Sequence, residues 1–244
     1  MLKILLLFLF TLSASALVEN FHELSYKTNF GNCPSKTTGS AALEILEVFR
    51  QEKSLLKTKK FIEKNKLREK YYLKTYDIEY NPVTQKVALK FTCPIPIARV
   101  QVFKKDGTQQ FHSVLSINGL RIDPNYENVL RNEKKITRDL PVVSMEYSEL
   151  TEQKLKDITR LLKNIDEKLR NKISDVVFDS EQKLVFVMSN KNHAISAFLG
   201  KSDWKNKSAK LLKTIEYFDR KKKHPKFVKF LNSQKVVVNF SSHL

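Results

Sequence analysis

The sequence is poor in glycine and cysteine, and these shortages exclude several classes of site. It contains five glycines and two cysteines among its 244 residues. Five glycines leave little material for the loops that cradle phosphates, and neither a P-loop nor a G-x-G-x-x-G motif occurs. The nucleophile motif G-x-S-x-G and the zinc motif H-E-x-x-H are also absent. Nucleotide-binding enzymes and the common hydrolases are therefore not expected.

Histidines at metal-ligand spacing are also lacking. None of the five lies three to five residues from another strong ligand in a metal-binding pattern; they are His22, His112, His193, His224 and His243. Asp77 with Glu79, and Asp123, are acidic residues that solvent-facing strand and turn positions explain better than acid–base catalysis. We therefore expect a binding or scaffolding protein with no cofactor, no metal and no catalytic residue, rather than an enzyme.

The chain has no hydrophobic run long enough to be an ordinary membrane-spanning helix. Lys3 precedes a nine-residue, mainly apolar run, Ile4–Leu12, and small residues follow as far as Ala16. These three parts predict a secretory signal sequence over residues 1–16. An uncleaved short anchor, or a buried first strand or helix, are the alternatives, since a spanning helix needs roughly 20 apolar residues. The expected location is outside the cytoplasm.

The two cysteines, Cys33 and Cys93, both follow the predicted signal. An even cysteine count in an exported protein favours a disulfide between them, and two buried free thiols are the alternative.

Positive charge is abundant, with a formal net charge of +18. A basic protein outside the cytoplasm would meet anionic lipid headgroups or wall polymers, and little nucleic acid. Two stretches could face such a polyanion: the lysine-rich helix predicted over residues 54–72, and the loop that carries Lys221, Lys222, Lys223 and Lys226. The cations of the lysine-rich helix are more often explained by a solvated helix face.

Residues 20–95 are predicted to form a compact α+β module. A weakly alternating strand over residues 21–30 is followed by a helix that Ser40 could cap and by the helix over residues 54–72. Residues 76–92 then alternate with the period of two that is typical of a half-buried hairpin. The order is β-α-α-β-β, with the helices on one side of a three-stranded sheet. Pro94 and Pro96 interrupt the strands, and we place the domain boundary there.

Residues 96–244 are predicted to form a β-rich domain with two or three packed helices. A helix capped by Ser148 is expected over residues 148–170, where leucine and isoleucine recur at helical spacing. Three strands follow between Ile173 and Leu199, then a helix that Ser202 could cap, and two last strands over residues 227–231 and 235–240.

Several short motifs occur in an order that resembles the FtsQ/DivIB family of bacterial cell-division proteins. The motifs are Asn81-Pro82, Val87-Ala88-Leu89, Pro96-Ile97-Ala98, Asn118-Gly119, Leu140-Pro141-Val142 and Phe198-Leu199-Gly200. The resemblance implies a POTRA domain over residues 20–95 and a β domain over residues 96–244, both outside the cytoplasmic membrane. It also implies a non-catalytic scaffold of the division complex at the septum. This chain departs from the family at its start. Family members usually begin with a cytoplasmic tail and a full membrane helix, whereas this chain begins with a predicted signal sequence.

The resemblance further implies that a terminal strand of the β domain accepts a strand from a small coiled-coil membrane partner. Val236, Val238 and Phe240 alternate with Lys235, Val237 and Asn239, which fits a strand that is free on one side. An inner strand paired on both sides would show the same pattern. Trp204 could flank such a site, although a buried core position suits it better. The alternative function is a secreted or periplasmic basic protein that binds envelope polymer or lipid headgroups.

Overall fold

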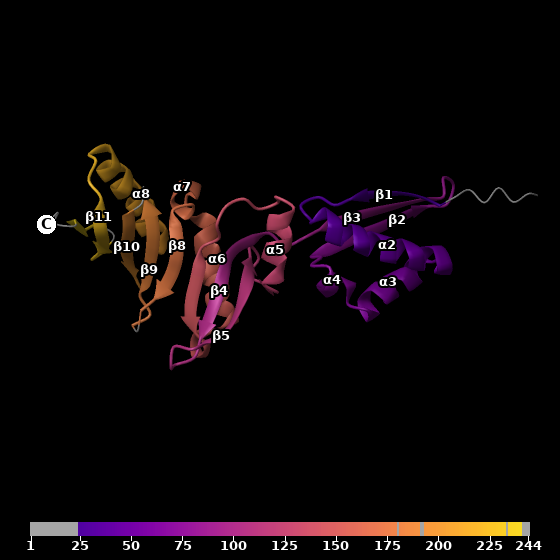
Figure 1. Cartoon of the computed structure of the whole chain (residues 1–244), viewed down its shortest axis with the longest axis horizontal. Helices are drawn as coiled ribbons and strands as arrows, with labels where there is room; N and C mark the ends of the chain where they lie inside the picture. Colours follow the sequence, from indigo (N-terminus) through magenta and orange to yellow (C-terminus); the bar gives the residue numbers. More distant parts are fainter. Residues whose placement is uncertain (1–23, 180, 191–192, 233, 241–244) are drawn as a thin grey trace, which may run out of the picture.

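The structure is a computed structural model, and it describes residues 24–179, 181–190, 193–232 and 234–240. The fold class is α+β, as predicted, with one three-stranded and one nine-stranded sheet. Figure 1 shows the two sheets side by side along the long axis of the molecule, the first at one end and the second at the other. The predicted signal sequence, 1–16, lies outside the described residues.

The first module, residues 24–92, has the predicted β-α-α-β-β order with one additional short helix. Its three strands lie in the order β1-β3-β2, with β1 parallel and β2 antiparallel to β3. The elements are β1 (Ser25–Asn29), α2 (Ser35–Glu52), α3 (Leu55–Lys64), α4 (Leu67–Lys70), β2 (Thr75–Asn81) and β3 (Lys86–Thr92).

The period of two in the hairpin divides this sheet into a buried face and a solvated face. Ile78 and Leu89 are opposite each other and buried, and they join the core that the helices cover. Asp77 and Lys90 are opposite each other on the other face, where both are exposed. Cross-strand pairs of opposite charge suit a surface in water.

Helix α2 begins earlier than predicted, because its first turn is capped from a distant part of the chain. Ser40 is not the cap: the helix starts at Ser35, and the preceding Pro34 has no side chain that can cap it. The backbone N–H groups of Ser35 and Lys36 instead donate to the carboxylate of Glu133, at 3.0 Å for Lys36. A carboxylate suits this position because helix N-terminal N–H groups lack partners within the helix.

The single helix predicted over residues 54–72 is two helices, α3 and α4. Ser54 caps α3 as a side-chain acceptor for the N–H of Lys57 at 3.4 Å. Lys66, between the two helices, has a φ of 50°, in the left-handed region, which ends a regular helix.

The second module, residues 96–240, contains the nine-stranded sheet in the order β12-β11-β10-β9-β8-β7-β4-β5-β6. The pairs β4–β7, β7–β8 and β10–β11 are parallel, and the others are antiparallel. The strands are β4 (Pro96–Phe103), β5 (Gln109–Ser116), β6 (Arg121–Ile122), β7 (Val142–Glu146), β8 (Ile173–Phe178), β9 (Leu184–Asn190), β10 (His193–Gly200), β11 (Pro225–Phe230) and β12 (Val236–Phe240).

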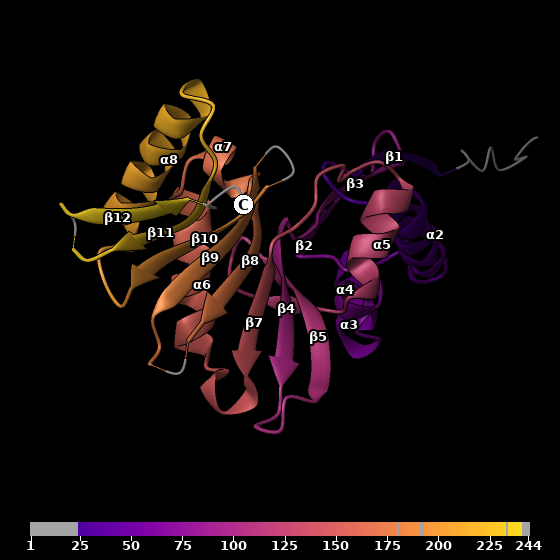
Figure 2. The same ribbon diagram turned by 60° about the vertical axis from the view of Figure 1, so that its left-hand side comes forward.

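Helices cover one face of this larger sheet, and Figure 2 shows α6 and α8 packed along it. The helices of this module are α5 (Asn125–Asn132), η1 (Tyr147–Glu149), α6 (Glu152–Asn164), α7 (Glu167–Arg170) and α8 (Trp204–Arg220). The core between sheet and helices includes Val100, Val143, Ile158, Phe186 and Leu211.

The helix predicted over residues 148–170 is divided into η1, α6 and α7. Thr151, not Ser148, caps α6, and its hydroxyl accepts the N–H of Lys154 at 3.1 Å. Ile165 has an extended backbone that separates α6 from α7, although its side chain stays buried in the same core as the leucine stripe. Ser202 is not a cap either: Asp203 precedes α8 without a capping side-chain bond.

Contacts around the proline segment join the two modules. Tyr126 of α5 is fully buried in the core of the first module, together with Leu130. Its hydroxyl donates to the carbonyl of Pro94 at 2.7 Å, and its ring lies 4.9 Å from that of Tyr72. Figures 1 and 2 both show α5 at the junction.

A disulfide lies at the same junction, between Cys33 and Cys93, whose Cα atoms are 5.0 Å apart. Both cysteines are buried. The neighbouring Asn32 side chain donates to the Cys93 carbonyl at 2.8 Å and accepts the Cys93 N–H at 3.1 Å. The start of α2 is therefore tied to the end of β3 by one covalent bond and two hydrogen bonds.

Candidate protein-binding edge

Strand β12 is the last strand of the nine-stranded sheet. It pairs with β11 in antiparallel register, for example Val228 opposite Val238 and Lys229 opposite Val237. Within the described residues no strand pairs with its other side. The backbone N–H and C=O groups along that side are a template for a further strand.

The side chains of β12 alternate between the two faces of the sheet. Val236 and Val238 pack against the core under the helices. Val237 is 44% exposed and, with the exposed Asn239, lies on the face without helices. Phe240 reaches the helix side, where its ring lies 5.0 Å from that of Phe218 of α8. A strand added at this edge would continue both faces.

The face without helices carries apolar side chains next to this edge that the sequence did not single out. Phe198 of β10 is 38% exposed, and its ring makes an edge contact with Phe227 of β11 at 6.3 Å. Phe227 lies opposite Asn239. The sequence signal that could have identified Phe198 is the period of two in β10. Ile195, Ala197 and Leu199 lie on the buried face, so Phe198 lies on the other.

Lys235 belongs to the turn before β12 rather than to the strand. Its N–H donates to the side chain of Asn232 at 2.7 Å, and its carbonyl accepts the N–H of Leu231 at 3.1 Å. The ammonium of Lys210 in α8 donates to the carbonyl of Gln234 in the same turn. This turn fixes the register with which β12 returns along β11.

Trp204 does not lie at this edge. Its indole N–H donates to the carbonyl of Gly200 at 2.7 Å, and its ring makes an edge contact with Phe178 at 6.1 Å. Phe178 belongs to β8, and three strands separate β8 from β12. The half-buried tryptophan fixes the start of α8 on the opposite part of the sheet.

The predicted basic loop lies between α8 and β11. Lys221, Lys222 and Lys223 are exposed there, whereas Lys226, predicted in the same loop, is an exposed residue of β11. The Lys221 ammonium lies 4.6 Å from the centre of the Tyr217 ring, and its hydrogen bond to the Tyr217 hydroxyl lowers the pKa of that hydroxyl. These cations lie beside β11 and could attract an anionic partner.

His224 and His193 meet beside this loop, with their rings stacked 4.3 Å apart. His224 Nδ1 is buried, and no hydrogen-bond partner for it occurs in the described part of the chain. No cluster of three or more histidine, cysteine, aspartate or glutamate side chains that could hold a metal is found among those residues.

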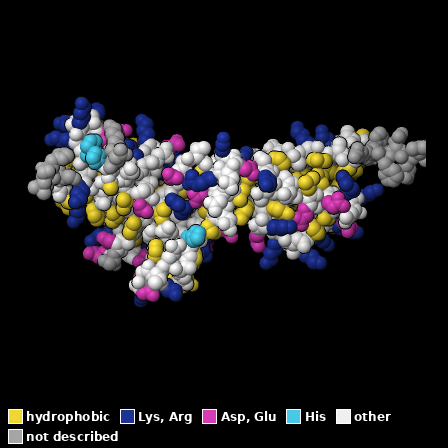
Figure 3. All heavy atoms as spheres, viewed as in Figure 1, with side chains coloured by type: hydrophobic (Ala, Val, Ile, Leu, Met, Phe, Trp, Pro, Cys, Tyr) yellow, Lys and Arg dark blue, Asp and Glu magenta, His cyan; other side chains and the backbone are white. Residues whose placement is uncertain are grey.

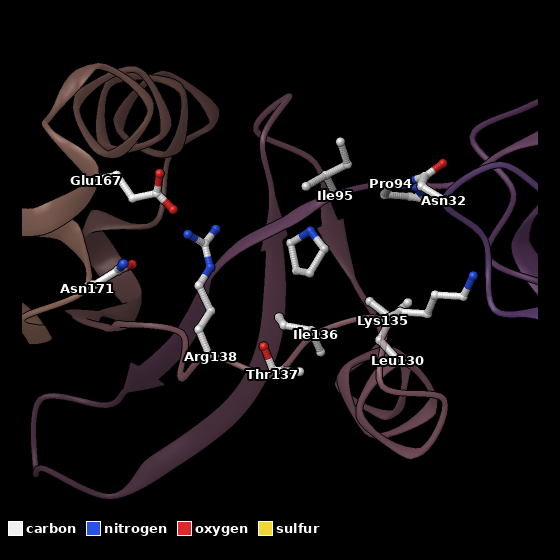
Figure 4. Close-up of a pocket in the computed structure, with 11 residues that line it drawn as sticks. Asn32, Pro94, Ile95, Leu130, Lys135, Ile136, Thr137, Arg138, Glu167 and Asn171 are labelled. Atoms are coloured by element: carbon white, nitrogen blue, oxygen red, sulfur yellow. The ribbon is translucent and has the colours of Figure 1, made fainter.

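A cavity of about 540 Å³ lies between the modules, next to the proline segment. Figure 4 shows the Arg138 guanidinium and the Glu167 carboxylate pointing toward each other across it. Asn32, Ile136 and Asn171 also line the cavity.

No helix in the described ranges combines the length and apolar character that crossing a membrane requires. No protein-family model matches the sequence. No curated protein matches it either. One similar solved structure is the major extracytoplasmic domain of the trans isomer of the bacterial cell-division protein DivIB from Geobacillus stearothermophilus. The likeness has a TM-score of 0.31 and 17% sequence identity, and it covers 53% of this chain and 97% of the DivIB domain.

Proposed function

We propose that this protein is a non-catalytic, extracytoplasmic scaffold of the bacterial division complex, and that it binds partner proteins by accepting a strand at β12. The observation that carries the proposal is the position of β12 at the end of the nine-stranded sheet. Backbone hydrogen bonds would supply affinity, and side chains on the two faces would select the partner. The β-α-α-β-β module before this sheet agrees with the domain order that the resemblance to the FtsQ/DivIB family implies.

The apolar surroundings of the edge support a protein partner. Val237 and Phe198 are exposed on one face of the sheet, and the rings of Phe218 and Phe240 contact each other on the other face. Exposed apolar side chains beside an unpaired edge favour a partner segment with alternating apolar residues. Such binding should depend only weakly on salt, in contrast to binding by surface lysines.

The test is a pair of C-terminal truncations in cells that carry a fluorescent protein inserted in the exposed β4–β5 turn, next to Gly107. The first variant ends at Gln234 and lacks β12; the control ends at Phe240 and keeps it. The full chain and the control should form a band at the division site and recruit partners, and the first variant should lose recruitment. Uniform fluorescence of the full chain, or equal recruitment by both truncations, would contradict the proposal.

The alternative function is a basic envelope protein that binds anionic polymer, and the exposure of the three loop lysines and of Lys226 at the start of β11 favours it. A fourfold variant distinguishes the two functions. It replaces four lysines with glutamine: Lys221, Lys222, Lys223 and Lys226. If the scaffold proposal holds, this fourfold variant still forms the band. If the alternative holds, the fourfold variant loses its salt-sensitive binding to the envelope.

A further inference from the structure

The start of β1 and the β2–β3 turn lie together at one end of the first module. Ser25 lies opposite Lys86, and Lys86 lies opposite Asn81 on its other side. The first strand therefore begins beside the tip of the hairpin. In Figure 1 this end is the one farthest from the nine-stranded sheet.

The turn between α2 and α3 lies at the same end. The rings of Phe49, near the end of α2, and Tyr80, near the end of β2, are 4.9 Å apart. Lys53 follows Phe49 by one helical turn, and its N–H donates to the Phe49 carbonyl at 2.8 Å. At the far end of α3, Glu63 accepts the hydroxyl of Tyr76 at the start of β2, at 3.3 Å. Helix α3 therefore starts at the hairpin tip and runs away from it.

Exposed apolar side chains and exposed lysines both occur at this end. Val83 at the hairpin tip is 91% exposed, and Leu56 in the first turn of α3 is 65% exposed. Lys53, Lys57 and Lys60 are exposed on and before the same helix. Of the three, Lys57 has an ion pair, with Glu52 at 2.7 Å. Dark blue and yellow surfaces adjoin at this end of the module in Figure 3.

Single exposed apolar side chains are common on proteins, and lysines usually face water. What distinguishes this end is the chain that leads to it. The described chain starts here at Leu24, and the sequence before it contains the apolar run Ile4–Leu12. Residues 12 to 24 can span at most about 40 Å when fully extended. Where that run stays in a bilayer as an uncleaved anchor, this end of the first module therefore lies within about 40 Å of the surface.

We infer that this end of the first module, defined by Lys53, Leu56, Lys57, Lys60 and Val83, rests on an anionic lipid bilayer. Leu56 and Val83 enter the boundary between headgroups and acyl chains, and the lysines approach the lipid phosphates. The β12 edge lies in the other module, at the opposite end of the long axis (Figures 1 and 2). The contact goes beyond the proposed scaffold function and involves a different surface.

The experiment places an environment-sensitive fluorophore on the full chain in vesicles. The label is attached through Leu56→Cys or Val83→Cys, while Cys33 and Cys93 remain joined in their disulfide. Leu231→Cys, at a position 59% exposed in the second module, carries the control label. The vesicles contain brominated lipid that quenches the label on contact, and they are either neutral phosphatidylcholine or a mixture with anionic phosphatidylglycerol.

In the anionic vesicles the labels at residues 56 and 83 should be quenched, and the label at residue 231 should not. Exchanging Lys53, Lys57 and Lys60 for glutamine should reduce the quenched population by about fivefold per lysine in the limit of weak contact. No vesicle binding, no quenching at residues 56 and 83, or equal quenching at residue 231 would each overturn the inference. The vesicles contain no division partner, so such a failure would leave the scaffold proposal unaffected.

Discussion

At the residue scale, Glu44 shows how one carboxylate joins α2 to the end of α4 and the residue that follows it. It accepts a hydrogen bond from the Tyr71 hydroxyl at 2.6 Å and one from the Lys70 ammonium at 2.9 Å. These bonds stabilise the ionised carboxylate, the one from Tyr71 most, and lower the pKa of Glu44 below its ordinary value of 4.5. The contribution of Glu44 to stability therefore depends on pH.

Replacing Tyr71 with phenylalanine should raise the pKa of Glu44, because the largest cause of its depression is removed. A carboxyl whose pKa is lower in the folded state stabilises the fold above the unfolded pKa, and this effect is lost as the pH falls through the folded value. The difference in unfolding free energy between the wild type and Tyr71→Phe should thus be present at pH 7 and shrink below about pH 4.5.

An NMR titration of the Glu44 carboxyl carbon measures the shift, and urea unfolding at pH 7 and pH 3 measures the stability. Tyr147→Phe is the control, because Tyr147 is 55% exposed and lies in η1, away from Glu44. An unchanged Glu44 pKa in Tyr71→Phe would show that the hydroxyl does not contribute.

At the element scale, the strands were predicted well from the sequence. The strand predicted to begin at Ile173 is β8, and the two that follow it are β9 and β10, with ends that differ by at most two residues. Their periodicity was informative because one face of the sheet is covered by helices and the other is open. Val176 is fully buried, for example, whereas Val177 on the open face is half-buried.

The helix boundaries were predicted less well, because their causes lie elsewhere in the chain. The partner of the first turn of α2 is Glu133, which is 98 residues from Ser35. Local capping rules chose Ser40 because they consider neighbouring residues alone. A cap from another module is outside their reach.

The candidate site was predicted in part. The alternation over residues 235–240 identified a strand, but its edge position follows from the parallel pairing of β10 and β11, which the sequence pattern does not contain. Trp204 and Phe218 lie on nearly the same face of α8 but about 21 Å apart along its axis. The helical stripe placed both on one face, and the distance along the helix decides which of them meets β12.

The two faces of β12 should respond differently to an added charge. Val238→Asp should lower the free energy of unfolding by about 2–3 kcal/mol, because it places a carboxylate against the core under α8. Val237→Asp, on the open face, should change it by less than about 0.5 kcal/mol. Urea unfolding of the two variants measures the difference. Equal effects of the two substitutions would mean that β12 does not alternate as described.

At the scale of the whole molecule, the two modules share side chains across the proline segment. Tyr126 follows the boundary predicted at residues 95 and 96, yet it is buried in the core of the first module. Burial also raises the pKa of its hydroxyl, which stays protonated and donates to the Pro94 carbonyl. Glu133, just after α5, caps the first turn of α2 in the same region. The first module therefore depends on residues from the second for its full stability.

Tyr126→Ala should consequently destabilise the first module although the residue follows the proline segment. Removing this fully buried ring should cost about 3–5 kcal/mol and leave the Pro94 carbonyl without its donor. Hydrogen exchange should accelerate at the amides of β2, β3 and α4, since exchange reports the stability of the unit that opens. Leu162→Ala, which removes a fully buried side chain from the core of the second module, is the matched control. Its faster exchange should be confined to β7–β10 and α6. If Tyr126→Ala instead accelerated exchange only in the second module, α5 would not stabilise the first module.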